Sequence, residues 1–154
     1  MKVKLFLASA LVAFSLPASA YDADLAKKLD AFYGKLTFEA FANSTIFLKP
    51  EAFVEAIRKD PSIVVIDIRT PEEQAFIRSG YQNTLSIPLS ELFEAKNLDQ
   101  IPSDKRLVIL CHSATRAFPA ALNLKMLGFS NVQVLEQGIV GMAQVSAPKT
   151  CPVK

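Results

Sequence analysis

Residues 107–116 read Leu-Val-Ile-Leu-Cys-His-Ser-Ala-Thr-Arg, a continuous apolar run that leads directly into a short polar stretch. Such a run is typical of a parallel strand that is buried on both faces of its sheet. The next residues, 116–127, have a helical pattern, and Gly128 is well placed to end that helix. This stretch therefore predicts a strand, a tight loop and a helix in direct succession.

Short apolar segments alternate with helical patterns along most of the chain. Thr70, Pro71 and Glu73 match the start of a helix, with Thr70 as the cap and Glu73 completing a capping box. Strands that alternate with helices predict an α/β fold with a parallel sheet. The remaining predicted elements are strands at 63–66, 84–87 and 132–135, and helices at 22–36 and 50–59.

The loop after residue 110 combines a thiol with groups that attract anions. Ligands of open parallel sheets gather at the carboxyl ends of the strands, and the two strongest strands here end at Asp67 and Cys111. The first N–H groups of a helix lack internal partners, so residues 112–116 can form an electropositive nest. Arg116 adds a permanent, forked positive charge.

In that field we expect Cys111 to be a thiolate near neutral pH and a nucleophile in an oxyanion-binding cradle. For an isolated cysteine, the alternatives are an inert buried thiol or one half of a disulfide. The position of Cys111 between a strand and an arginine-bearing helix start favours the nucleophile.

Residues 1–20 have the pattern of a secretory signal peptide. Lys2 and Lys4 precede an apolar stretch at 5–16, and small residues at 18–20 mark a cleavage site. The apolar stretch is shorter than the roughly 20 residues that span a bilayer core. We therefore expect an exported, periplasmic protein that has no membrane anchor after cleavage.

Composition and charge exclude several classes of function. The formal net charge of the whole chain is +2, and loss of Lys2 and Lys4 with the signal peptide brings it to zero. No basic stripe is present, so a nucleic-acid partner is not expected. One His and two Cys exclude a metal site that needs several such ligands, and we expect neither a metal nor another cofactor.

The ordered motifs resemble those of the rhodanese family of single-domain sulfurtransferases. The family's active loop has a Cys, four residues and an Arg, as Cys111 and Arg116 do here, whereas related phosphatases have five residues between them. The loop length thus favours a sulfur substrate over a phosphate. Similar segments upstream and downstream are 66–73 (Asp-x-Arg and a capped helix), 87–89 (Ile-Pro-Leu), 127–129, 132–135 and Gly138.

The resemblance covers roughly residues 46–142. It implies a parallel-sheet, three-layer rhodanese-like domain with an added N-terminal helix. The corresponding division of the chain is a signal peptide at 1–20, a helical extension at 21–45, the domain at 46–146 and a tail at 147–154.

The resemblance also implies a two-step reaction without a cofactor. The Cys111 thiolate takes the outer sulfur of a donor such as thiosulfate and becomes a persulfide, which a thiol or cyanide acceptor then discharges. Backbone N–H groups of residues 112–116 would stabilise the persulfide. Arg116 would orient the loop and neutralise the anionic donor. The residues assigned to donor binding are His112, Ser113, Ala114, Thr115, Arg116 and Arg69.

Several of these assignments have alternatives. His112 either has a role at the site, in donor binding or in tuning the thiolate, or is an exposed loop side chain. Ser113 and Thr115 most simply form hydrogen bonds within the loop or cap the helix. Arg69 is a candidate substrate ligand, but a structural ion pair with Asp67 near the site is the preferred interpretation.

Three departures from the family pattern stand out. Ala114 replaces a usual glycine, and alanine tolerates positive φ poorly, which predicts an altered loop or a slower site. Residues 79–84 replace the family's Gly-His-Ile-Pro-Gly-Ala, with Asn83 a candidate for the left-handed turn position. Residues 137–138 and Met142 replace the usual Gly-Gly and Trp.

Cys151 lies in the tail, outside the resemblance. It is a candidate resolving thiol that closes a disulfide with Cys111, or else a passive thiol or an intermolecular link. The alternatives to a sulfurtransferase are therefore a thiol redox protein that uses Cys111 and Cys151, or a rhodanese-like binding module with weak turnover. The natural donor and acceptor, the role of residues 21–45 and the oligomeric state stay open.

Overall fold

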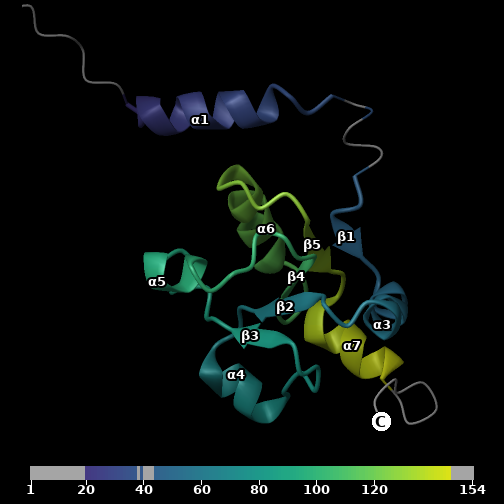
Figure 1. Cartoon of the computed structure of the whole chain (residues 1–154). Helices are drawn as coiled ribbons and strands as arrows, with labels where there is room; N and C mark the ends of the chain where they lie inside the picture. The colour runs from purple at the N-terminus through teal and green to yellow at the C-terminus, as the bar shows by residue number, and fades with distance from the viewer. Residues whose placement is uncertain (1–19, 38, 40–43, 147–154) are drawn as a thin grey trace, which may run out of the picture. The chain divides into compact units, whose positions relative to one another are not determined.

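The computed structural model describes residues 20–37, 39 and 44–146 (Figure 1). Nearly all of the predicted signal peptide and the whole tail, including Cys151, lie outside these residues. The chain divides into two units, Met1–Thr37 and Phe38–Lys154. Among the described residues, no helix combines the length and the apolarity that a bilayer crossing requires.

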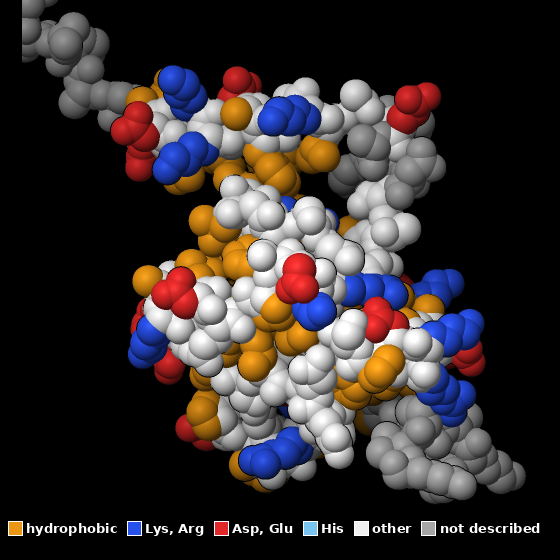
Figure 2. Space-filling view, viewed as in Figure 1, with side chains coloured by type: hydrophobic (Ala, Val, Ile, Leu, Met, Phe, Trp, Pro, Cys, Tyr) orange, Lys and Arg blue, Asp and Glu red, His pale blue; other side chains and the backbone are white. Residues whose placement is uncertain are grey.

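The described part of the N-terminal unit is an amphipathic helix, α1 (Ala23–Tyr33). The Asp22 side chain caps it by accepting a hydrogen bond from the Leu25 N–H at 2.9 Å. None of its residues is buried, and Figure 2 shows both apolar and charged side chains on its surface. The helix predicted at 22–36 is confirmed, although it ends earlier, at Tyr33.

The larger unit is built on a parallel sheet of five strands in the order β1-β5-β4-β2-β3. Every residue of β2, β4 and β5 is buried, as expected for strands covered on both faces. The predicted α/β fold with a parallel sheet is therefore confirmed. The strands are β1 (Phe47–Leu48), β2 (Val64–Asp67), β3 (Thr84–Ser86), β4 (Leu107–Leu110) and β5 (Val132–Leu135).

Helices cover both faces of this sheet (Figure 1). Ala121 of α6 shares an apolar cluster with Ile109 of β4. Phe53 of α3 and Ile139 of α7 share a second cluster with Val108, the neighbour of Ile109. Because successive strand residues point to opposite faces, the two clusters lie on opposite sides of the sheet, which confirms the three layers. The helices of this unit are α3 (Pro50–Lys59), α4 (Pro71–Phe76), α5 (Ala95–Leu98), α6 (Ala117–Met126) and α7 (Gly138–Val145).

The register of β2 and β4 places their carboxyl ends side by side. Asp67 pairs with Leu110, and the Ile68 N–H donates to the Leu110 carbonyl at 2.9 Å. Ile68 and Cys111 therefore begin adjacent loops at one edge of the sheet, and Arg69 follows in the first of them. This is the edge at which ligands of parallel sheets are expected.

Candidate active site

Cys111 immediately follows β4 and is 1% exposed. Its carbonyl oxygen accepts a hydrogen bond from the Ile139 N–H at 2.9 Å. The start of α7 thus supports the first residue of the loop. Of the two cysteines, only Cys111 lies in the described part of the chain, where its thiol is free.

The loop 111–116 turns sharply at Ala114, whose φ is +77°. The Ala114 carbonyl oxygen then accepts a hydrogen bond from the Phe118 N–H at 3.0 Å as α6 begins. A left-handed backbone costs a residue with a Cβ about 1–2 kcal/mol. The absence of glycine therefore does not remove the left-handed turn; the surrounding structure imposes it on alanine.

Arg116 is anchored by an acidic partner from α4. Its Nη1 and Nη2 atoms donate to the two carboxylate oxygens of Glu73 at 2.8 and 2.5 Å. These bonds are the main reason why the pKa of Glu73 falls to about 2. Glu73 likewise raises the pKa of Arg116, and the Cys111 side chain adds a smaller effect in the same direction. Arg116 thus orients the loop beside Cys111, and the Glu73 carboxylate partly neutralises its positive charge.

Glu73 owes its position to the capping box of α4. The Thr70 N–H donates to Oε2 of Glu73 at 3.1 Å, and the Glu73 N–H donates to Oγ1 of Thr70 at 3.3 Å. The predicted capping box is therefore confirmed. Its sequence pattern gave no sign that Glu73 also binds Arg116, because the two residues are 43 positions apart.

Gly138 lets α7 approach the loop closely. Its φ is +56°, and a Cβ there would overlap the carbonyl oxygens of Cys111 and His112. Only glycine fits both the conformation and the space. α7 begins at Gly138, and nothing in the sequence indicated that this residue contacts the loop.

The short side chains of the loop do not cap α6. Ser113 and Thr115 are exposed, and their hydroxyl oxygens lie 3.2 Å apart in a hydrogen bond. Arg116 occupies the cap position without a side-chain cap. The prediction of a hydroxyl cap is therefore wrong, whereas hydrogen bonding within the loop is present. His112 is exposed at the loop surface, as the second interpretation of this residue expects.

The structure corrects the assignment of Arg69 as a substrate ligand. Arg69 is 1% exposed, and its Nε and Nη2 atoms donate to the Asp67 carboxylate at 2.9 and 2.6 Å. Its Nη1 atom donates to the Ile77 carbonyl at 2.8 Å. Because the guanidinium makes three hydrogen bonds inside the protein, its role is structural, and the ion pair with Asp67 is the correct alternative.

Asn83 does not supply a left-handed turn. Among described residues other than glycine, only Ala114 and Gln137 have positive φ. The Asn83 side chain instead donates to the Ile63 carbonyl at 2.8 Å. Asn83 therefore holds the start of β2. The left-handed residue that we expected within residues 79–84 is not found there.

The described residues contain no group of three or more His, Cys, Asp or Glu side chains arranged to hold a metal ion. What the loop does offer is backbone donors. Within the described part of the chain, the N–H groups of residues 112–116 donate to no other protein group. A thiol, a cation and several available N–H groups therefore meet in one short loop, which suits an anionic substrate.

Comparisons with known proteins agree with this geometry. The profile of the Rhodanese-like domain matches residues 50–144. A sulfurtransferase of Allochromatium vinosum is 28% identical over 102 residues, which are 66% of this chain and 92% of that protein. The proposed sulfur carrier protein YrkF of Bacillus subtilis is 30% identical over 91 residues, or 59% of this chain. That match spans only 47% of YrkF, so the chain corresponds to about half of it.

Solved structures show the same fold. A rhodanese-related protein from Thermoplasma volcanium superimposes with a TM-score of 0.55 at 28% identity. The match covers 66% of this chain and 93% of that protein. The part in common therefore accounts for nearly all of that solved chain.

Proposed function

This chain belongs to the rhodanese-like domain family, and from that premise we propose that it transfers sulfane sulfur through a persulfide on Cys111. In the first step the Cys111 thiolate attacks the outer sulfur of a donor such as thiosulfate. A new S–S bond forms, the old one breaks, and sulfite leaves with its electron pair. In the second step cyanide or a thiol attacks the outer sulfur of the persulfide and releases the Cys111 thiolate.

One observation carries the proposal: the N–H groups of residues 112–116 have no partner within the described protein, and they follow directly after Cys111. A persulfide anion on Cys111 needs hydrogen-bond donors, and fixed backbone donors stabilise it without reorganisation. Arg116, held by Glu73, adds positive charge beside the same sulfur. Arginine does not exchange its proton near neutral pH, so its part is orientation and charge rather than acid–base catalysis.

The test is a thiosulfate:cyanide assay on the reduced mature chain beside Cys111→Ser. We expect turnover, and intact mass after thiosulfate treatment should show one added sulfur. Both signals should be absent from Cys111→Ser, with the fold of the variant checked by circular dichroism. Absence of turnover and of sulfur loading in the reduced protein would overturn the proposal for thiosulfate.

A second variant separates sulfur transfer from thiol redox chemistry. Cys151→Ser removes the candidate resolving thiol and leaves Cys111 in place. A sulfurtransferase should retain its turnover in this variant. Loss of activity in Cys151→Ser would favour the redox alternative, in which the two thiols act as a pair.

We also propose that the protein is exported and that cleavage follows Ala20. The support is the pattern of charge, apolar stretch and small residues at positions 1–20. Expression of the full chain in a Gram-negative host should place a product that begins at Tyr21 in the periplasmic fraction. An uncleaved product in the cytosolic fraction would contradict this.

A further inference from the structure

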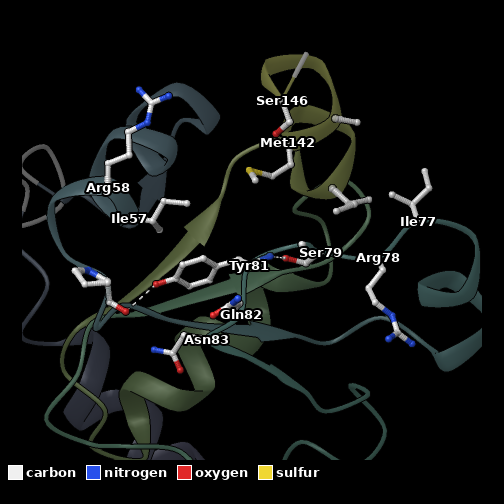
Figure 3. Close-up of a pocket in the computed structure, with 14 residues that line it drawn as sticks. Ile57, Arg58, Ile77, Arg78, Ser79, Tyr81, Gln82, Asn83, Met142 and Ser146 are labelled. Carbon is white, nitrogen blue, oxygen red and sulfur yellow. Dashed lines mark hydrogen bonds between the residues drawn. The ribbon is translucent and has the colours of Figure 1, made fainter. Parts of the chain in front are cut away.

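A pocket of about 510 Å³ lies between α3, the segment 77–83 and α7 (Figure 3). No residue of the loop 111–116 lines it. Its size falls within the range typical of sites for small molecules. The pocket is therefore distinct from the loop that carries Cys111.

The inner surface of this pocket is apolar and held in place. Ile57 of α3 and Ile139 and Met142 of α7 contribute aliphatic surface. In Figure 3 the Tyr81 ring lies below Ile57 and Met142. The Tyr81 ring packs edge-on to Phe53 with 6.1 Å between centroids. The Tyr81 hydroxyl lies within hydrogen-bond distance of two backbone carbonyls, at 2.9 and 3.0 Å. These contacts make the pocket preformed, which lowers the cost of binding.

The pocket coincides with two departures from the family pattern. Met142 stands where a tryptophan is usual, and residues 79–83 belong to the replaced segment. A methionine fills less volume than an indole, and its flexible thioether adapts to different apolar partners. The pocket is thus lined by residues at which this chain departs from the family pattern, and not by the residues of the shared motif.

Positive charge flanks the apolar interior. Arg58 and Arg78 lie on opposite sides of the pocket (Figure 3), and Arg58 also pairs with Glu55 at 3.9 Å. None of the described residues that line it is acidic. The Asn83 amide already donates a hydrogen bond to the Ile63 carbonyl, so it adds little hydrogen-bonding capacity to the interior of the pocket. An apolar body with a negative group at one end complements this arrangement.

We propose that this pocket binds a small amphipathic anion. Its apolar part, a short acyl chain or one or two rings, lies against Met142, Ile139 and the Tyr81 ring. Its carboxylate or sulfonate lies toward Arg78. The proposal does not depend on sulfur transfer, because the measurement is of binding alone.

The test is titration of the ¹⁵N-labelled mature chain with octanoate, followed by NMR. Saturable shifts should map to α3, residues 77–83 and α7. Met142→Trp fills the pocket and should weaken binding at least about tenfold, because losing contact with about two methylene groups already has that effect. The matched control is Leu127→Trp, at an exposed residue that does not line the pocket, and it should bind as the unaltered chain does.

The charge of the ligand is tested separately. Octan-1-ol, which has the same chain without the carboxylate, should bind more weakly than octanoate. Arg78→Gln should weaken octanoate about two- to fivefold, the range of one exposed ion pair, and leave octan-1-ol unchanged. Equal affinity for both probes, or no effect of Arg78→Gln, would overturn the assignment of an anion.

The site itself is overturned by the absence of saturable shifts, by shifts that map elsewhere, or by full affinity in Met142→Trp. If Met142→Trp does not fold, Ala143→Glu replaces it, since Ala143 is exposed and lines the pocket. The added carboxylate should repel octanoate, and unchanged binding in that variant would equally reject the proposal.

Discussion

The carboxylate of Glu73 binds the guanidinium of Arg116 through two hydrogen bonds, at 2.8 and 2.5 Å. The pair joins the first turn of α4 to the last residue of the loop that begins at Cys111. About a third of each side chain is exposed. Since forked Arg–carboxylate pairs fix geometry as well as charge, α4 restricts the orientation of the loop.

Glu73→Gln should slow sulfur transfer. Glutamine retains an acceptor for the capping box but loses the charge that holds Arg116. We expect kcat/KM for thiosulfate to fall about tenfold, because small displacements of a catalytic loop have effects of that size or larger. Steady-state assays should compare it with Glu72→Gln, the adjacent exposed carboxylate, which should change little. Equal rates in the two variants would show that the ion pair does not position the loop.

The same residue should make stability depend on pH. The pKa of Glu73 is 4.5 ordinarily and about 2 in the folded protein, so its stabilising effect is complete above pH 4.5 and is lost as pH falls toward 2. Allowing for its partial exposure, we expect about 1–2 kcal/mol. Urea unfolding between pH 6 and pH 3 should show a shallower decline for Glu73→Gln. The lowered pKa of Asp60 does not involve Glu73 and acts alike in both proteins, so parallel curves would contradict the prediction.

Gly138→Ala should disrupt the loop. A Cβ at this position overlaps the backbone of Cys111 and His112, in addition to the strain of a positive φ. We expect a loss of more than about 3 kcal/mol in the free energy of unfolding, and loss of sulfur transfer. The control is Gly128→Ala, with φ +106° and no atom near the new Cβ, which should cost only about 1–2 kcal/mol. Similar losses in both would mean that strain alone matters.

Ala114→Gly should stabilise the protein. Glycine adopts the left-handed conformation of this residue without strain, and we expect a gain of up to about 1 kcal/mol in urea unfolding with transfer activity retained. Ala120→Gly, in the interior of α6, should instead lose about 1 kcal/mol or more. A destabilised Ala114→Gly variant would show that the loop conformation is not strained.

Arg69→Met should reduce stability rather than substrate affinity. Removal of the arginine side chain leaves the buried Asp67 carboxylate without its cation, with the backbone N–H of residue 69 as its remaining donor at 3.2 Å, and we expect a loss of about 3–5 kcal/mol. The double variant with Asp67→Asn should recover part of it. The KM for thiosulfate of whatever protein remains folded should be unchanged. An increase in KM without loss of stability would restore Arg69 as a substrate ligand.

Local patterns were enough to predict the elements that surround the loop. The helix at 50–59 and the strands at 107–110 and 132–135 have the predicted bounds. Each depends on residues close together in the chain, whose apolar runs or helical spacing match one type of element. The capping box of Thr70 and Glu73 has the same local origin. By contrast, β1 has only two residues and no pattern, and it exists because Phe47 pairs with Val134.

The sequence by itself determined the parallel α/β architecture and placed Cys111 at the end of a buried strand. It could do so because buried strands and turns each require a recognisable pattern of neighbouring residues. Only the tertiary structure decided what surrounds that cysteine. It buried Arg69 against Asp67, brought Glu73 to Arg116, imposed positive φ on Ala114 and opened the pocket beside Met142. These features arise where segments far apart in the chain meet, and their geometry depends on packing that no single segment encodes.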